Sequence, residues 1–118
     1  MANPNIVNVA TINGKTDVFA LTTTSANLVT ATANTVFKIN SIFIANIDGT
    51  NAADVTVNYY DGSNSRAIAN TISVPADASL SIIDKNNAFY LEENEIIQGF
   101  ASANSDLECM ISYEVISD

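Results

Sequence analysis

An antiparallel β-sandwich, of either the jelly-roll or the immunoglobulin-like type, is the fold class that this 118-residue sequence predicts. Apolar and polar residues alternate along most of the chain, which is typical of strands with one buried face. No stretch has the period of an amphipathic helix. Turn-forming residues recur about every eight to twelve positions, a spacing typical of all-β sandwiches. The chain is therefore expected to be all-β, with the sandwich type left open.

The alternation defines the expected strands one by one, because β-branched runs are bounded by Gly, Pro, Asn and Asp. These strands are Ile6–Ile12, Asp17–Leu21, Asn27–Thr32, Val36–Ile47, Asp54–Tyr60, Ala67–Val74, Ser79–Ile83, Phe89–Leu91, Glu95–Ala101 and Leu107–Ile116.

Turn chemistry separates the expected strands. The pairs Asn13-Gly14 and Asp61-Gly62 favour tight hairpin turns, because these residue types tolerate positive φ. Pro75 ends one strand, since proline fixes φ and cannot donate to a ladder.

The last strand shows the alternation most clearly. Its expected buried face carries Leu107, Cys109, Ile111, Tyr113 and Val115, and its exposed face carries Glu108, Met110, Ser112 and Glu114.

Length and composition predict a single domain over residues 1–118. The chain is 47% hydrophobic and 14% charged, which is enough apolar material for one core. Residues 1–35 are polar and weakly patterned. They are expected to form two edge strands or an arm that reaches a neighbouring subunit.

The formal net charge is −9. Nucleic acids and anionic membranes repel such a surface, so neither is an expected partner. Cys109 is the only cysteine and predicts a core residue rather than a disulfide. The first residues lack a signal-peptide pattern and no apolar run could span a membrane. Synthesis and folding in a cytoplasm are therefore expected.

The segment Val36–Ile47 carries apolar residues on both faces when read with strict alternation. One face would hold Phe37, Ile39, Ser41, Phe43, Ala45 and Ile47, and the other Val36, Lys38, Asn40, Ile42, Ile44 and Asn46. A sandwich strand needs only one apolar face. The second face would need a cover from the N-terminal region or another chain, which predicts an oligomer. The candidate interface residues are Val36, Lys38, Ile42, Ile44, Ile6, Val7 and Val9.

Little in the sequence points to chemistry, so no catalytic residue, cofactor or metal is expected. The chain has no histidine, which leaves a Ser or Cys nucleophile without its usual base and zinc without imidazole ligands. Glu92, Glu93 and Glu95 are expected to form a solvated acidic turn rather than a catalytic pair. Asp48, Asn51 and Asp54 only superficially resemble a calcium loop. A sugar-stacking platform could be formed by Tyr59, Tyr60, Phe89, Tyr90, Phe100 and Tyr113, but packing in the core and at interfaces is the default interpretation of this set.

A family resemblance rests on three segments. They are Val36–Ile42 with Ala45–Val57, Ile68–Asp77, and the ending that includes Tyr90-Leu91-Glu92-Glu93 and Ser112-Tyr113-Glu114. Over about residues 36–116 the chain resembles small virion structural proteins of marine tailed bacteriophages. Asn94-Glu95 departs from the Gly-Asp that often follows the acidic pair in that pattern.

This resemblance implies a non-enzymatic role in the virion. It implies a capsid decoration or cement protein that binds the capsid exterior through the major capsid protein or other virion proteins, as a homotrimer. A neck, tail or fibre-associated adaptor is the alternative within the virion. A carbohydrate-binding attachment module is the alternative from another class, although Trp is absent and the aromatic residues are dispersed.

Overall fold

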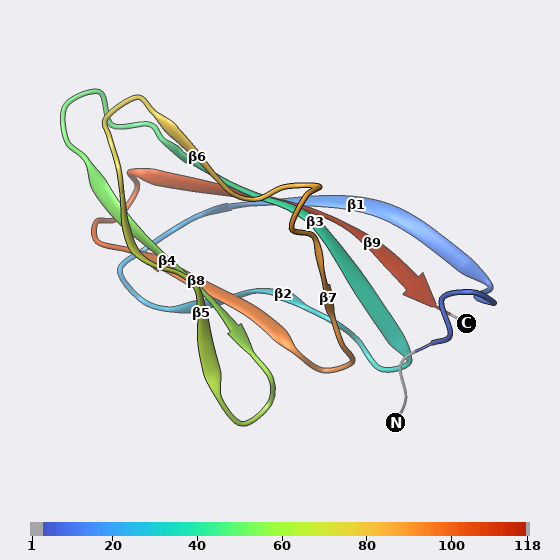
Figure 1. Cartoon of the computed structure of the whole chain (residues 1–118). Coiled ribbons are helices and arrows are strands. Elements are labelled where there is room, and N and C mark those ends of the chain that lie inside the picture. The colour runs from blue at the N-terminus through green and yellow to red at the C-terminus, as the bar shows by residue number, and fades with distance from the viewer. Residues whose placement is uncertain (1–3, 118) are drawn as a thin grey trace.

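A computed structural model of the chain describes residues 4–117, which form nine strands and no helix (Figure 1). The strands are β1 (Thr11–Ala20), β2 (Ala26–Thr30), β3 (Thr35–Asn46), β4 (Ala53–Tyr60), β5 (Ser65–Val74), β6 (Ser79–Ile83), β7 (Phe89–Leu91), β8 (Ile96–Ala101) and β9 (Leu107–Ser117).

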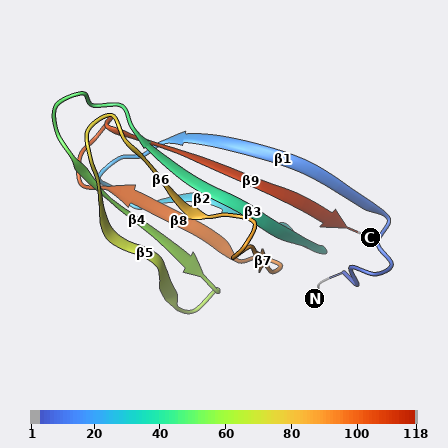
Figure 2. The same cartoon turned by 45° about the horizontal axis from the view of Figure 1, so that its top comes forward.

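The strands form two antiparallel sheets that pack face to face (Figures 1 and 2). The larger sheet has the order β1-β9-β3-β6, and β7 pairs with β3 beside β6. The smaller sheet has the order β2-β8-β4-β5. The predicted all-β sandwich is therefore confirmed.

The pairing is nested, and this decides which sandwich it is. β1 pairs with β9, β2 with β8, β3 with β6 and β7, and β4 with β5. If β6 and β7 are taken as one interrupted strand, eight strands fold as a long antiparallel hairpin rolled onto itself, which is a jelly roll. In an immunoglobulin domain the first two strands share a sheet, whereas β1 and β2 lie in different sheets.

The core lies between the sheets and consists of one cluster of apolar side chains. β9 contributes Leu107, Cys109, Ile111 and Tyr113, all buried, while Glu108 and Met110 between them are exposed. The predicted faces of this strand are thus confirmed. Phe37 of β3 stacks on Tyr113 with 5.0 Å between ring centroids, which closes the core at that end of the larger sheet.

The predicted faces of Val36–Ile47 are wrong beyond Asn40, and a β-bulge is the reason. Ile39 stands opposite Tyr113 and Ser41 opposite Ser112, so Asn40 is an extra residue in β3. An extra residue shifts the side-chain phase of everything after it. Ile42 and Ile44 therefore turn into the core, and both are 0% exposed.

The start of the chain also differs from the prediction. No strand covers Ile6–Ala10, and Asn13-Gly14 makes no turn. Both residues lie within β1 opposite Val115 and Glu114 of β9. The predicted turn at Asp61-Gly62 is confirmed: Gly62 has φ 98° and the Asp61 carboxylate accepts hydrogen bonds from two loop amides.

One residue holds a backbone conformation that its side chain disfavours. Thr71 of β5 has φ 52°, at a register shift between β4 and β5. Its N–H donates to Thr56 Oγ1 at 3.1 Å, which fixes the conformation. Left-handed backbone costs a β-branched residue about 1–2 kcal/mol, whereas asparagine tolerates it better.

We expect Thr71→Asn to stabilise the domain by about 1 kcal/mol and to raise Tm by about 4 °C, because the strain falls while the hydrogen bond from the residue 71 N–H to Thr56 Oγ1 is kept. Thermal unfolding followed by circular dichroism measures this. The matched control is Asn94→Thr, which places a β-branched residue at φ 65° and should lower Tm. A Thr71→Asn variant that melts below the wild type would contradict this explanation.

Candidate functional site

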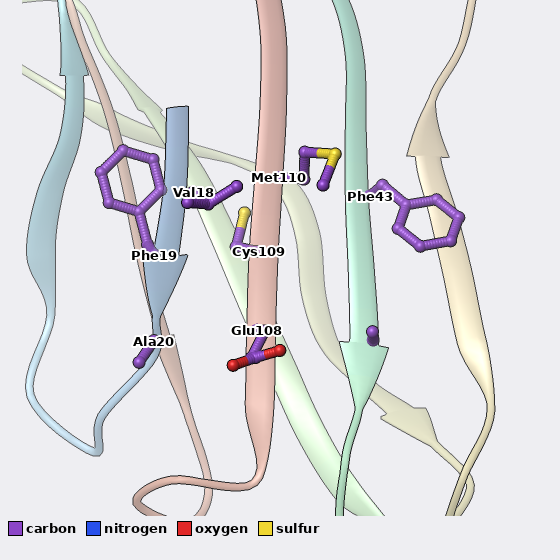
Figure 3. Close-up of a pocket in the computed structure, with 8 residues that line it drawn as sticks. Val18, Phe19, Ala20, Phe43, Glu108, Cys109 and Met110 are labelled. Atoms are coloured by element: carbon purple, nitrogen blue, oxygen red, sulfur yellow. The ribbon is translucent and has the colours of Figure 1, made fainter. Parts of the chain in front are cut away.

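Three apolar side chains lie in a row on the outer face of the larger sheet. Val18 of β1 stands opposite Met110 of β9, and Met110 stands opposite Phe43 of β3. They are 68%, 46% and 40% exposed. Figure 3 shows them on three neighbouring strands. We call these three residues the apolar row.

A shallow depression of about 360 Å³ lies along the apolar row. Its other side is formed by Ala20 and Ala45, whose small side chains leave the space open, and by Glu108 between them (Figure 3). Exposed apolar side chains that lie singly are ordinary, but a contiguous set on a flat sheet is typical of a binding surface. The apolar row is therefore the leading candidate for a contact surface.

The N-terminal segment covers the other end of this outer face. Val36 of β3 and Ile116 of β9 point outward, yet each is only 4% exposed. Pro4 and Ile6 line a second depression of about 290 Å³ together with Val36. Part of the predicted second face of β3 is thus covered by the chain's own N-terminal residues.

Between the two ends, the outer face is polar. Thr16 and Ser112 join β1 to β9 through their hydroxyl groups at 2.9 Å. Asn40 donates to Glu114 at 2.9 Å across β3 and β9. This polar band separates the apolar row from the covered end.

The structure separates the predicted interface residues. Ile42 and Ile44 are fully buried, so the folded domain does not present them to a partner, and the bulge at Asn40 is the reason. Val36 is buried and Lys38 half-buried. The other three lie in the N-terminal segment: Ile6 and Val7 are exposed and Val9 half-buried. Contact of these residues with another chain stays a prediction.

The apolar row was missed by sequence reasoning. Met110 was expected on an exposed face, which was the one available signal. Phe43 was expected on the same face as Phe37 and Ile39, because the sequence pattern does not reveal the bulge that turns Phe43 to the opposite face. Val18 was expected in a strand but without an outward role.

Two side chains that could carry chemistry, Cys109 and Asp48, have structural roles. Cys109 is 1% exposed, and burial raises the pKa of its thiol to about 12, so the nucleophilic thiolate does not form near neutral pH. The Asp48 carboxylate accepts the N–H groups of Thr50 and Asn51 at 2.8 and 3.2 Å. These hydrogen bonds lower the pKa of Asp48.

The acidic turn is only partly solvated, which corrects the prediction. Glu92 is exposed, but Glu93 and Glu95 are half-buried. Glu93 accepts a hydrogen bond from the amide of Asn34, and Glu95 accepts one from the Tyr59 hydroxyl. The turn therefore ties β8 to the β2–β3 loop and to β4.

Residues 4–117 contain no group of three side chains that could hold a metal ion. The same residues include no helix that could span a membrane.

Comparisons with known proteins agree on the fold. No protein-family model matches the chain, and no curated protein matches its sequence. One similar solved structure comes from work titled "Bacillus endospore appendages form a novel family of disulfide-linked pili", with a TM-score of 0.54, 16% identity, and coverage of 92% of this chain and 88% of that chain. Another comes from "Acidic stable capsid structure of Helicobacter pylori bacteriophage KHP30", with a TM-score of 0.53, 8% identity, and coverage of 92% and 90%. At these identities the likeness shows the fold alone.

Two tyrosine–carboxylate hydrogen bonds predict how stability depends on pH. Tyr113 donates to Asp17 at 2.5 Å, and Tyr59 donates to Glu95. Burial, followed by these carboxylates, raises the pKa of both tyrosines. A raised pKa means that the folded state keeps a proton which the unfolded chain loses near pH 10. The resulting stabilisation is complete below pH 10 and is lost as pH rises above it.

We therefore expect the unfolding free energy to fall between pH 9 and pH 11, and to fall less steeply in the Tyr59→Phe/Tyr113→Phe double variant, which has no such protons. Urea unfolding at a series of pH values measures both slopes. Parallel slopes for wild type and variant would contradict the assignment.

Proposed function

We propose that this chain is a non-enzymatic structural protein of a tailed-bacteriophage particle, a decoration or cement protein that binds the capsid exterior as a trimer. The observation that carries the proposal is the apolar row of Val18, Met110 and Phe43, exposed on the outer face of the larger sheet. The partner is the major capsid protein or another protein of the shell.

Two further observations support this role. The sequence resembles small virion proteins over about residues 36–116. The fold is similar to that of a chain from a bacteriophage capsid structure, although that likeness concerns the fold alone. The sequence resemblance and the shared jelly roll are separate arguments, and both favour an assembled particle.

The physical requirements of a cement protein fit the surface. Such a protein stabilises a shell through modest contacts that symmetry repeats many times. A small apolar row is too weak for a tight contact in isolation, because stable interfaces bury about 1,200–2,000 Å² in total. Repetition across capsomer joints makes a contact of this size sufficient.

The acidic charge fits a soluble protein that adds to an assembled shell. A formal net charge of −9 keeps the protein soluble and disfavours non-specific aggregation. A capsid surface that offers basic groups around an apolar site would offset that charge. We expect this combination of groups on the partner.

The copy number in purified particles tests the role itself. We expect the protein to be present at one copy or more per capsomer, measured by quantitative mass spectrometry against the major capsid protein. About a dozen copies, the number of a symmetric ring, would favour the neck, tail or fibre adaptor and overturn the cement proposal. A particle reconstruction then locates the protein.

The apolar row is tested by Val18→Asp and Met110→Asp. We expect each variant to remain folded, because both side chains are exposed, and to bind undecorated capsids at least about tenfold more weakly, since a charge is desolvated at the contact. Saturation binding to isolated capsids measures this.

The matched control is Ile72→Asp, which adds the same charge at an exposed apolar position on β5 of the smaller sheet. If Val18→Asp and Ile72→Asp bind alike, the contact does not use the apolar row.

A further inference from the structure

The four sheet edges of the described chain differ in their openness to strand pairing. An edge strand presents unpaired main-chain groups, and proteins blunt such edges with short strands, breaks and bulges. β2 has five residues and a register shift. β5 has two register shifts, and the edge formed by β6 and β7 is interrupted. β1 alone is long and regular, with ten residues in unbroken register against β9.

The main-chain groups that face the free edge of β1 can be identified. Leu21 N donates to Leu107 O at 2.9 Å, one step beyond the last paired residue. Hydrogen-bonded and non-hydrogen-bonded positions alternate along an antiparallel pair. The odd-numbered residues of β1 therefore bond to β9. The even-numbered residues direct N–H and C=O groups to the free edge: Ile12, Gly14, Thr16, Val18 and Ala20.

The side chains of β1 are complementary to a second copy of β1. In an antiparallel pair centred on Thr16, Lys15 stands opposite the partner's Asp17, and Asp17 stands opposite the partner's Lys15. These would be non-hydrogen-bonded positions, where side chains approach most closely. Within one chain Lys15 and Asp17 are already 4.0 Å apart, so the pair would assemble four charges of alternating sign.

The same charges disfavour the neighbouring registers. Centring the pair on position 15 would place Lys15 opposite the partner's Lys15, and centring it on position 17 would oppose the two aspartates. Like charges directly opposite each other destabilise a strand pair. The charges of β1 thus favour the register centred on Thr16 over these two neighbours.

Gly14 is a second, independent observation. It lies in the interior of β1, where glycine weakens a strand, and its φ is not in the left-handed region. Nothing lies within 4 Å of where its Cβ would be, so packing within the chain does not require glycine. In the register centred on Thr16, Gly14 stands opposite the partner's Val18 and leaves room for that side chain.

We propose that two copies of this chain pair through their β1 edges, antiparallel and centred on Thr16, to join their larger sheets into one continuous sheet. This contact goes beyond the proposed function, because it uses main-chain groups at the edge of the sheet. Of the apolar row, only Val18 lies beside the contact, while Met110 and Phe43 lie on β9 and β3, away from the edge. A three-fold contact through another surface is compatible with it. Where both contacts form, two trimers are joined through their β1 edges, and the even-numbered species include a hexamer.

The charge pairs provide the test. Sedimentation velocity of the full chain over a concentration series should show a dimer or another even-numbered species. Lys15→Asp should weaken pairing at least tenfold, because it places acids opposite acids. The control Lys85→Asp makes the same charge change in the β6–β7 loop and should leave the affinity within about twofold of wild type. An equimolar mixture of Lys15→Asp and Asp17→Lys should recover pairing as a heterodimer.

Cross-linking tests the register without a charge change. Thr16→Cys should cross-link rapidly with a short thiol-specific reagent, because the two side chains face each other and the native Cys109 is buried. Ser73→Cys, exposed on the β5 edge, is the control and should not cross-link at that rate. A wild type that is monomeric at high concentration, a trimer as the only species, or equal cross-linking at both positions would overturn the proposal.

Discussion

The β-bulge at Asn40 is the constraint on which the larger sheet depends. β3 lies between β9 and the interrupted edge of β6 and β7, so one extra residue there reverses the faces of everything that follows. Ile42 and Ile44 enter the core as a result, and burial of side chains of that size contributes about 1.5–3 kcal/mol each. The same reversal turns Phe43 outward beside Met110. The burial of Ile42 and Ile44 and the exposure of Phe43 are thus two consequences of one local irregularity.

Strands with one solvent-exposed face and one buried face could be predicted from the sequence. β6 and β7 have the bounds that alternation predicted, and β9 differs only by its last residue. Their side chains obey the simple two-residue period, because β9 buries one face against the core and leaves the other to solvent. The fold class followed from the same signal. The jelly-roll order did not, since pairing between strands far apart in sequence leaves no local trace.

The failures have equally local causes. Asn13-Gly14 has the composition of a hairpin turn, but a hairpin forms only where the segments on either side of the turn pair with each other. β1 instead pairs with β9 from the far end of the chain, and that pairing holds both residues extended. The predicted interface was affected most, because the bulge buries Ile42 and Ile44, which were candidates, and exposes Phe43, which was not. Bulges are fixed by the sheet as a whole, so strict alternation is the wrong guide at such points.

The two contacts proposed for the larger sheet are compatible because they use different groups. The outer face offers side chains, of which Met110 and Phe43 come from the central strands β9 and β3 and Val18 from the edge strand β1. The free edge of β1 offers main-chain groups, which are the same whatever lies on the face. The smaller sheet has neither a long regular edge nor an apolar row of this kind among the described residues. An arrangement with the larger sheet toward its neighbours and the smaller sheet toward solvent therefore satisfies both surfaces at once.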